Sequence, residues 1–302
     1  MAASIFIDGE AGTTGLGIRE RLAGLDVAVR SIDPRHRKDP QARLDLMRAV
    51  DLVVLCLPDD AARGSSHMVA CLDEPPKLLD ASTAFRASPG WVYGFAELAP
   101  EQSLAIATAP RVSNPGCYAT GAVALLRPLV ASKLIAADMP ISINAVSGYS
   151  GGGHTMIEAH ETAGGPAFQL YALDLEHKHV PEIMAHSGLS VRPLLVPSVG
   201  HFRQGMIVSI PLHLDRLGSG ASAAALRACL RDWYADARHV VVAQSAGVLS
   251  ADGLAGTDMM ELAVHGTDCA PHALLTARLD NLGKGASGAA IQNICLMLGL
   301  TD

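Results

Sequence analysis

The chain has 302 residues, of which 49% are hydrophobic, 18% charged and 4% aromatic, and its formal net charge is -7 at pH 7. This length and composition are typical of an α/β enzyme with a sizeable core, and we expect two domains. The negative charge disfavours binding to nucleic acids and to anionic membranes. Six scattered cysteines without Cys-x-x-Cys spacing are predicted to be reduced thiols, neither zinc ligands nor disulfides.

The start of the chain lacks the basic segment and long apolar segment of a signal peptide. No apolar stretch reaches the roughly 18 residues that a membrane-spanning helix needs. We therefore expect a cytoplasmic protein without a membrane span.

The first third of the chain alternates β-rich runs with helical candidates. Ala3–Asp8 is apolar, and residues 13–23 have the spacing of an amphipathic helix. Further strands are predicted at 27–32, 51–57, 77–80 and 104–107, and further helices at 41–50 and 59–72. This alternation predicts an α/β fold with a Rossmann-type, doubly wound parallel sheet.

The second half has a different pattern, opening with an Ala- and Leu-rich run at 118–136 that predicts a largely buried helix. Strands are predicted at 141–145, 205–214, 239–243, 261–265 and 272–279, and helices at 221–234 and 285–300. We expect an α/β catalytic domain with a mixed sheet. The predicted boundaries are 1–116, completed by 284–302, for the dinucleotide-binding domain and 117–283 for the catalytic and dimerisation domain.

A glycine motif lies between the first strand and the first helix. Its spacing is G-x-x-G-x-x-G, and its candidate cofactor-binding residues are Gly9, Gly12, Thr13, Thr14 and Gly15. Glycine permits a tight turn and close backbone approach, and the helix N-terminus that follows attracts a pyrophosphate. The alternative is a glycine turn in an unrelated α/β protein.

The residues about 20 positions further on leave the choice of nicotinamide cofactor open. Asp33 is an acid where NAD-binding proteins hold the free ribose hydroxyls. Four basic residues lie in the same segment and would favour the 2′-phosphate of NADP. They are Arg30, Arg35, Arg37 and Lys38.

Cys117 follows a Pro115-Gly116 turn and precedes the predicted buried helix. The unpaired N–H groups and the dipole of a helix N-terminus lower the pKa of a thiol, which an acyl-attacking cysteine requires near neutral pH. Cys117 is therefore the candidate nucleophile, whereas the other cysteines are interpreted as small hydrophobic residues.

Three segments together carry a resemblance over essentially the whole chain. They are the glycine motif, Ser113-Asn114-Pro115-Gly116-Cys117-Tyr118-Ala119-Thr120-Gly121, and Asp280-Asn281-Leu282-Gly283-Lys284-Gly285-Ala286-Ser287-Gly288. The chain resembles the N-acetyl-gamma-glutamyl-phosphate reductase family, in its shorter, second type. This resemblance implies NADPH-dependent reduction of N-acetyl-glutamyl 5-phosphate to the semialdehyde through a Cys117 thioester, in arginine biosynthesis.

The same resemblance extends to His177-Lys178-His179-Val180-Pro181-Glu182-Ile183, because the histidines of the matching family segment lie at the active site. In an extended segment both rings would point to one side. We favour His179 as general acid/base with His177 in support, and the sequence does not separate the two.

Further candidates come from the segments around these motifs. Ser147 and Ser150 lie in a glycine-rich loop, and Arg111 and Arg203 are cations that suit the substrate's carboxylate or phosphate. Asn114, within the cysteine motif, is a further substrate candidate. The resemblance implies cofactor contact for Asn281, Lys284 and Gly285. We expect a small-molecule substrate, no metal and a homo-oligomer, either a dimer or a tetramer.

Two alternatives remain. Aspartate-semialdehyde dehydrogenases share the architecture, the thioester chemistry and NADPH, although the N-P-G-C-Y segment favours the acetyl-glutamyl enzyme. A non-catalytic NADP-binding regulator is the alternative of another class, and it would have an unreactive Cys117.

Overall fold

The computed structural model describes residues 2–218, 220–267 and 270–301. It divides into two compact units, of which unit 1 comprises Met1–Pro115 with Ala286–Asp302 and unit 2 comprises Gly116–Gly285. The sequence predicted boundaries after residues 116 and 283, whereas the units divide after residues 115 and 285. The two sets differ by one and two residues. That each unit is a domain able to fold alone stays a prediction.

Unit 1 is built on a parallel sheet, sheet A, whose strand order is β2-β1-β3-β4-β6-β5. Its strands are β1 (Ala3–Asp8), β2 (Val27–Arg30), β3 (Leu52–Leu55), β4 (Lys77–Asp80), β5 (Val92–Tyr93) and β6 (Arg111–Ser113). The order reverses direction at β1, where a doubly wound sheet places its ligand site at the carboxyl ends of the strands.

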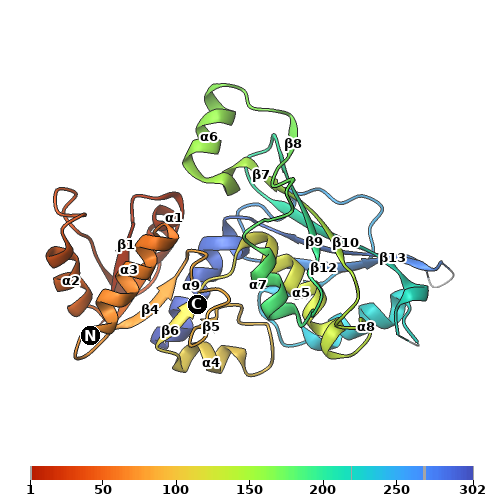
Figure 1. Cartoon of the computed structure of the whole chain (residues 1–302), viewed down its shortest axis with the longest axis horizontal. Coiled ribbons are helices and arrows are strands. Elements are labelled where there is room, and N and C mark those ends of the chain that lie inside the picture. The colour runs from red at the N-terminus through yellow and green to blue at the C-terminus, as the bar shows by residue number, and fades with distance from the viewer. Residues whose placement is uncertain (1, 219, 268–269, 302) are drawn as a thin grey trace. The chain divides into compact units, whose positions relative to one another are not determined.

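Helices cover both faces of sheet A because alternate side chains of each strand point to opposite faces. The helices of unit 1 are α1 (Thr13–Leu22), α2 (Pro40–Arg48), α3 (Asp59–Ala70), α4 (Gln102–Thr108) and α9 (Gly288–Leu298). Ile5 and Ile7 pack in one core with α1, α4 and α9, whereas Phe6 packs in a second core with α2 and α3. Figure 1 shows α9, in blue, beside the yellow and orange elements α4 and β4.

One predicted strand of unit 1 is wrong. Residues 104–107 lie in helix α4, and the strand that pairs with β4 is β6, which follows it. A short apolar run does not distinguish strand from helix, and the alanines of this one favour the helix. Only Ile106 of the run enters the core, while Leu104 is 68% exposed.

Unit 2 is built on a mixed sheet, sheet B, whose strand order is β11-β12-β13-β10-β7-β9-β8. Its strands are β7 (Ser142–Gly148), β8 (Phe168–Leu170), β9 (Leu194–Gly200), β10 (Met206–His213), β11 (Val240–Val242), β12 (Met260–His265) and β13 (His272–Leu279). The β11–β12 and β7–β9 pairs are parallel, and the remaining pairs are antiparallel. Together, the parallel sheet of unit 1 and the mixed sheet of unit 2 confirm the predicted fold class.

Helix α5 (Cys117–Ala131) packs on β10 and β13, between α7 (Val180–Ser187) and α8 (Ala223–Trp233). Its residues are buried on nearly every side, as the sequence predicted. Gly121 allows this close packing, because a Cβ there would lie 2.8 Å from Cγ2 of Val208. Such a helix holds its first residue firmly in place.

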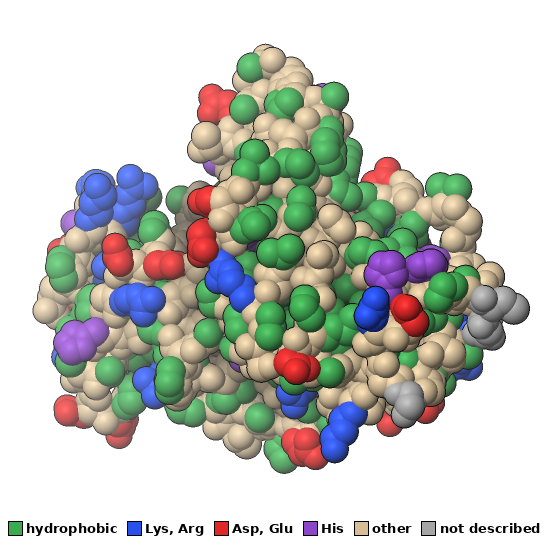
Figure 2. Space-filling model, turned by 45° about the vertical axis from the view of Figure 1, so that its right-hand side comes forward, with side chains coloured by type: hydrophobic (Ala, Val, Ile, Leu, Met, Phe, Trp, Pro, Cys, Tyr) green, Lys and Arg blue, Asp and Glu red, His purple; other side chains and the backbone are tan. Residues whose placement is uncertain are grey.

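A long excursion between β7 and β9 was not predicted. Before α7 it comprises a 3₁₀ turn (Tyr149–Gly152), helix α6 (Gly153–Thr162) and the edge strand β8, and Figure 1 shows α6 and β8 beyond the end of β7. Hydrophobic side chains gather over this part of unit 2 in Figure 2, where Phe168, Leu170 and Leu173 are 58, 49 and 73% exposed.

Two further observations concern predictions from composition. Cys56, Cys71, Cys117, Cys229 and Cys295 are free thiols, while Cys269 lies outside the described residues. Within the described ranges, no helix is both long enough and apolar enough to cross a bilayer.

Candidate functional site

The glycine motif forms the turn between β1 and α1. Gly9 has a φ of +93°, and a Cβ there would lie 2.3 Å from the carbonyl oxygen of Cys56. Gly12 is the N-cap of α1, and its N–H donates to the carbonyl of Gly9 at 3.1 Å. Gly15 packs beneath the turn, where a Cβ would lie 2.7 Å from the same carbonyl. The turn therefore requires glycine at Gly9 and Gly15 and leaves the N–H groups of Thr13 and Thr14, the first residues of α1, at the helix N-terminus.

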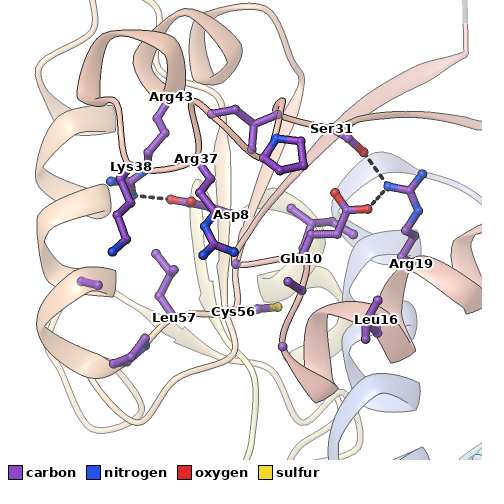
Figure 3. Close-up of a pocket in the computed structure, with 18 residues that line it drawn as sticks. Asp8, Glu10, Leu16, Arg19, Ser31, Arg37, Lys38, Arg43, Cys56 and Leu57 are labelled. Carbon is purple, nitrogen blue, oxygen red and sulfur yellow. Dashed lines mark hydrogen bonds and ion pairs between the residues drawn. The ribbon is translucent and has the colours of Figure 1, made fainter.

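A cavity of about 900 Å³ lies against this turn. Gly9, Glu10, Gly12 and Ser31 line one part of it, where Arg19 bonds both Glu10 and Ser31, and Arg37 and Lys38 line another. Figure 3 draws Arg37 and Lys38 among the side chains that line the cavity, together with the ion pair between Arg43 and Asp8 at the end of β1. The volume is that of a small-molecule or cofactor site, and the turn places helix N–H groups at its wall.

Two of the basic residues proposed for the cofactor lie elsewhere. Arg35 pairs with Asp33, with 2.7 Å between Nη2 and Oδ2, and neither residue lines the cavity. Hydrogen bonds from the side chain and the backbone of Arg35 lower the pKa of Asp33. Arg30 is exposed at the end of β2, outside the cavity wall. The cations that line the cavity include Arg37 and Lys38, which the sequence placed in the same basic cluster.

A half-buried cation in the same wall, Arg43, was not indicated by the sequence. Nη2 of Arg43 lies 2.6 Å from Oδ2 of Asp8, which also accepts from the hydroxyl of Ser65 at 2.9 Å. Arg43 comes from α2 and Ser65 from α3, so no local motif links them. The Asp8 carboxylate holds the guanidinium in position by a charge-assisted hydrogen bond.

In unit 2, Cys117 is the first residue of α5, and Gly116 is its N-cap with an extended ψ of 148°. Gly285 lies directly against the cysteine, since a Cβ there would be 2.9 Å from Cβ of Cys117. The N–H of Gly116 donates to Oε1 of Glu182 at 2.7 Å. Glu182 is in the first turn of α7, so the nucleophile candidate and the histidine segment are joined by one hydrogen bond.

The segment of His177 and His179 is not extended, contrary to our expectation. His179 has helical dihedrals and is the N-cap of α7, because Pro181 in the first turn favours a helix start. The two rings nevertheless lie together, with centroids 4.7 Å apart, and both side chains are buried.

Hydrogen bonds distinguish the two histidines. Nδ1 of His177 accepts from the backbone N–H of His179 at 3.1 Å, and its Nε2 lies 3.3 Å from the hydroxyl of Tyr171. Burial and the neighbouring Lys178 lower the pKa of His177 to about 4. His177 is therefore neutral near pH 7, with both nitrogens engaged.

Two tyrosines complete the surroundings of the histidine pair. Tyr118, the second residue of α5, contacts both rings edge-on at 5.7 and 5.8 Å and donates its hydroxyl to the carbonyl of Ser198 at 2.9 Å. Burial raises the pKa of Tyr118, and it raises that of Tyr171 to about 12. The sequence signalled Tyr118 through the cysteine motif, whereas Tyr171 had no signal.

Comparison with known proteins places the chain in a family. The profile of the semialdehyde dehydrogenase dimerisation domain matches residues 117–281. N-acetyl-gamma-glutamyl-phosphate reductase 2 of Pseudomonas putida is 50% identical, over 98% of this chain and 96% of that protein. The reductase of Burkholderia cenocepacia is 48% identical, over 99% of this chain and 98% of that protein. This chain belongs to the N-acetyl-gamma-glutamyl-phosphate reductase family.

Solved structures support the fold of this reductase family member. Aspartate semialdehyde dehydrogenase II of Vibrio cholerae matches with a TM-score of 0.73 and 15% identity over 99% of both chains. The Francisella tularensis aspartate semialdehyde dehydrogenase matches with a TM-score of 0.74 and 10% identity, over 99% of this chain and 100% of that one. At such low identity these likenesses show the two-sheet architecture alone.

The serine loop of this family member packs inside unit 2. Ser147 and Ser150 are both buried at the end of β7 and in the 3₁₀ turn. Asn281 donates to the hydroxyl of Ser150 at 2.9 Å and accepts from the N–H of Gly205 at 2.8 Å. Arg203 forms an ion pair with Glu161 of α6. Asn281 thus ties the loop to the end of β13, and the proposed ligand contacts of these residues stay predictions.

Three further candidates from the sequence are Asn114, Arg111 and Lys284. Asn114 lies in unit 1, where its amide donates to the carbonyl of Ala286 and accepts from Asn293, both at 3.0 Å. Arg111 is exposed in β6, with its guanidinium 5.8 Å from the Trp91 ring centre. Lys284 is 1% exposed in the turn Gly283–Ser287. Their roles in binding stay predictions.

The described ranges, 2–218, 220–267 and 270–301, bear on the expectation that the protein holds no metal. In those ranges, His, Cys, Asp and Glu side chains form no group of three or more that would hold a metal ion. The expectation that the reaction needs no metal stays a prediction.

Proposed function

We propose that the protein reduces N-acetyl-L-glutamyl 5-phosphate to N-acetyl-L-glutamate 5-semialdehyde and phosphate, with NADPH and through a thioester on Cys117, in arginine biosynthesis. Relatives that carry the name of this reductase at 48–50% identity support the proposal. The structural observation that carries it is the Gly116–Glu182 hydrogen bond, which links the start of α5 at Cys117 to the first turn of α7 at His179.

The chemistry follows from a thiol at a helix N-terminus, where the thiolate is stabilised. The sulfur of Cys117 attacks the acyl carbon, the carbon–oxygen bond to phosphate breaks, and phosphate leaves with the electron pair. NADPH, when bound, supplies a hydride for the carbonyl carbon of the thioester, and an acid/base side chain gives the carbonyl oxygen a proton, so that a thiohemiacetal forms on Cys117. The same side chain takes this proton back from the hydroxyl, the carbon–sulfur bond breaks, and the aldehyde and the Cys117 thiolate are released.

His179 is proposed as the group that moves the proton of the thiohemiacetal. The support comes from the surroundings of His177. Both nitrogens of His177 are engaged and its pKa is lowered to about 4, which removes it from the working range of a general acid near pH 7. His177 is proposed to hold the segment that carries His179.

The cavity of unit 1 is proposed to bind NADP(H). The start of α1 at Thr13 and Thr14 offers N–H groups for the pyrophosphate, and Ser31, Arg37 and Lys38 in the cavity wall suit the 2′-phosphate. Asp33, the residue that would favour NAD, is engaged with Arg35 outside the cavity. Charge at the cavity wall therefore favours the phosphorylated cofactor.

A homo-oligomer, as a dimer or a tetramer, is proposed from the family profile, whose description is a dimerisation domain and which covers most of unit 2. The exposed hydrophobic side chains of unit 2 are suited to such a contact. A cytoplasmic location is proposed because a thiol nucleophile needs a reducing compartment.

The assay that tests the function is run in reverse, with NADP, phosphate and one of two aldehydes. We expect phosphate-dependent NADP reduction with N-acetylglutamate semialdehyde, and its loss in Cys117→Ser. Cys71→Ser is the matched control, because Cys71 is an exposed thiol at the end of α3. Activity with aspartate semialdehyde alone would contradict the proposed substrate, and full activity of Cys117→Ser would contradict the thioester.

A further inference from the structure

The hydrogen bond between His179 and His177 can have only one direction. The backbone N–H of His179 donates to Nδ1 of His177, and an amide N–H cannot accept. In the neutral ring the proton therefore sits on Nε2. Nε2 lies 3.3 Å from the hydroxyl oxygen of Tyr171, so the ring N–H donates to that oxygen.

Tyr118 also contacts the ring of His177. The two rings meet edge-on with centroids 5.7 Å apart, and the hydroxyl of Tyr118 donates to the backbone carbonyl of Ser198 at 2.9 Å. The ring of Tyr171 meets the same histidine edge-on at 5.6 Å. Both tyrosines thus pack on His177, and the hydroxyl of Tyr171 is the one that lies beside its Nε2.

The backbone beside Tyr171 is strained where it leads to His177. Ala172 and Leu175 have φ values of 49° and 63°, in the left-handed region that residues with a Cβ seldom adopt. Such conformations persist only where the surroundings hold them. The N–H of Tyr171 donates to the carbonyl of Pro197 in β9 at 3.3 Å, and Arg192 donates to the carbonyl of Leu175 at 2.9 Å. Both ends of the turn are thus held by hydrogen bonds, and its path brings the ring of Tyr171 against that of His177.

We propose that Tyr171 is a positioning residue of the reaction: its hydroxyl fixes the ring of His177 in the Nε2–H tautomer, and His177 in turn holds the backbone at His179. The inference rests on the proposed function, because positioning matters only if His179 moves a proton. Tyr118, whose ring contacts that of His177, follows Cys117 directly in α5, so His177 packs against the first turn of the helix that begins at the nucleophile.

The test compares Tyr171→Phe, which removes only the hydroxyl, with Tyr234→Phe. Tyr234 is a matched control, since its buried hydroxyl also donates to a backbone carbonyl, that of Ala124 in α5, at 2.8 Å. We expect kcat of Tyr171→Phe to fall about tenfold with KM within about twofold, as for one lost positioning hydrogen bond. Tyr234→Phe should keep both constants.

Nuclear magnetic resonance of protein with ¹⁵N-labelled histidine supplies a readout that a purely structural role would not move. In the unsubstituted protein we expect an Nε2–H tautomer for His177, assigned by its loss in His177→Asn. The exchange of this proton with solvent should become at least about tenfold faster in Tyr171→Phe and stay unchanged in Tyr234→Phe.

An Nδ1–H tautomer of His177, an unchanged kcat in Tyr171→Phe, or a raised KM at unchanged kcat would each overturn the inference. The tautomer is measured without substrate. If the Nε2–H tautomer is present and the unsubstituted protein does not act on the acetylglutamyl substrate, the proposed function fails and the hydrogen bonds of His177 stand.

Discussion

The carboxylate of Glu182 accepts a hydrogen bond from the backbone N–H of Gly116, the residue before Cys117. Glu182 is 2% exposed, so its charge is stabilised by donors of the protein and not by water. A carboxylate three residues into a helix often bonds its own N-cap. Here it reaches the start of another helix, so the position of Cys117 depends on α7.

Removing this acceptor should impair the nucleophile. We expect Glu182→Ala to lower kcat/KM roughly 10- to 100-fold, the effect of losing one hydrogen bond to a charged group. The rate at which iodoacetamide alkylates Cys117 should fall as well. Glu182→Gln keeps an acceptor oxygen and is the control, so equal losses in both variants would argue against the positioning role.

Gly285 should not tolerate a side chain. In Gly285→Ala the new Cβ would lie 2.9 Å from Cβ of Cys117 and 3.0 Å from the carbonyl oxygen of Asp280. Since backbone must shift to relieve such contacts, we expect a Tm several degrees lower and slower alkylation of Cys117. Gly247→Ala is the control, because a Cβ at Gly247 meets no atom within 4 Å. Equal behaviour of the two variants would contradict the close approach.

The cavity of unit 1 predicts which arginine selects the cofactor. Arg37→Ala should raise KM for NADPH about tenfold and leave KM for NADH unchanged, because it removes one cation from the cavity wall. Arg35→Ala should change neither constant, since Arg35 is paired with Asp33 outside the cavity. A larger effect of Arg35→Ala on NADPH would show that the 2′-phosphate binds elsewhere.

Asp80 predicts a pH dependence of stability. The residue is fully buried at the end of β4, and burial raises its pKa to about 6 although the hydroxyl of Ser82 opposes this shift. A carboxyl whose pKa rises on folding stabilises the fold while protonated. That stabilisation is complete below the unfolded pKa of about 3.9 and is lost as the pH rises through about 6.

Asp80→Asn should therefore become progressively more stable than the unsubstituted protein between about pH 4 and pH 6, by up to about 3 kcal/mol, and the difference should stay constant above about pH 7. Chemical unfolding at several pH values measures it. Asp26→Asn, at an exposed position, is the control and should show no such trend. A constant difference for Asp80→Asn across this range would refute the shift.

Strong local patterns predicted much of the fold. Ala3–Asp8, Lys77–Asp80 and His272–Leu279 were predicted with the bounds that the structure has, because each is a β-rich run with clear ends. The error at 104–107 arose where a run was short and rich in alanine. The excursion between β7 and β9 was missed because its helix α6 is short and mostly exposed, and so has no apolar stripe to detect.

At the candidate site, the sequence identified residues that lie in motifs. Cys117, Gly9 and Gly12 carry their signal in neighbouring residues that set a turn and a helix start. Arg43, Tyr171 and the role of Glu182 have no such local signal, because each acts on a partner more than 30 positions away or across a turn with unusual dihedrals. Tertiary contacts of this kind are visible only in three dimensions.

The hydrogen bond between Asn114 and Ala286 joins the last strand of unit 1 to the point where the chain returns to it. The two ends of residues 116–285 are therefore neighbours, and these residues form an insertion within unit 1, between its last strand and helix α9. A short glycine linker from Pro115 to Ala286 would keep every strand of sheet A and helix α9 in one continuous chain. Such a junction, between a strand and a final helix, suits the exchange of one inserted unit for another.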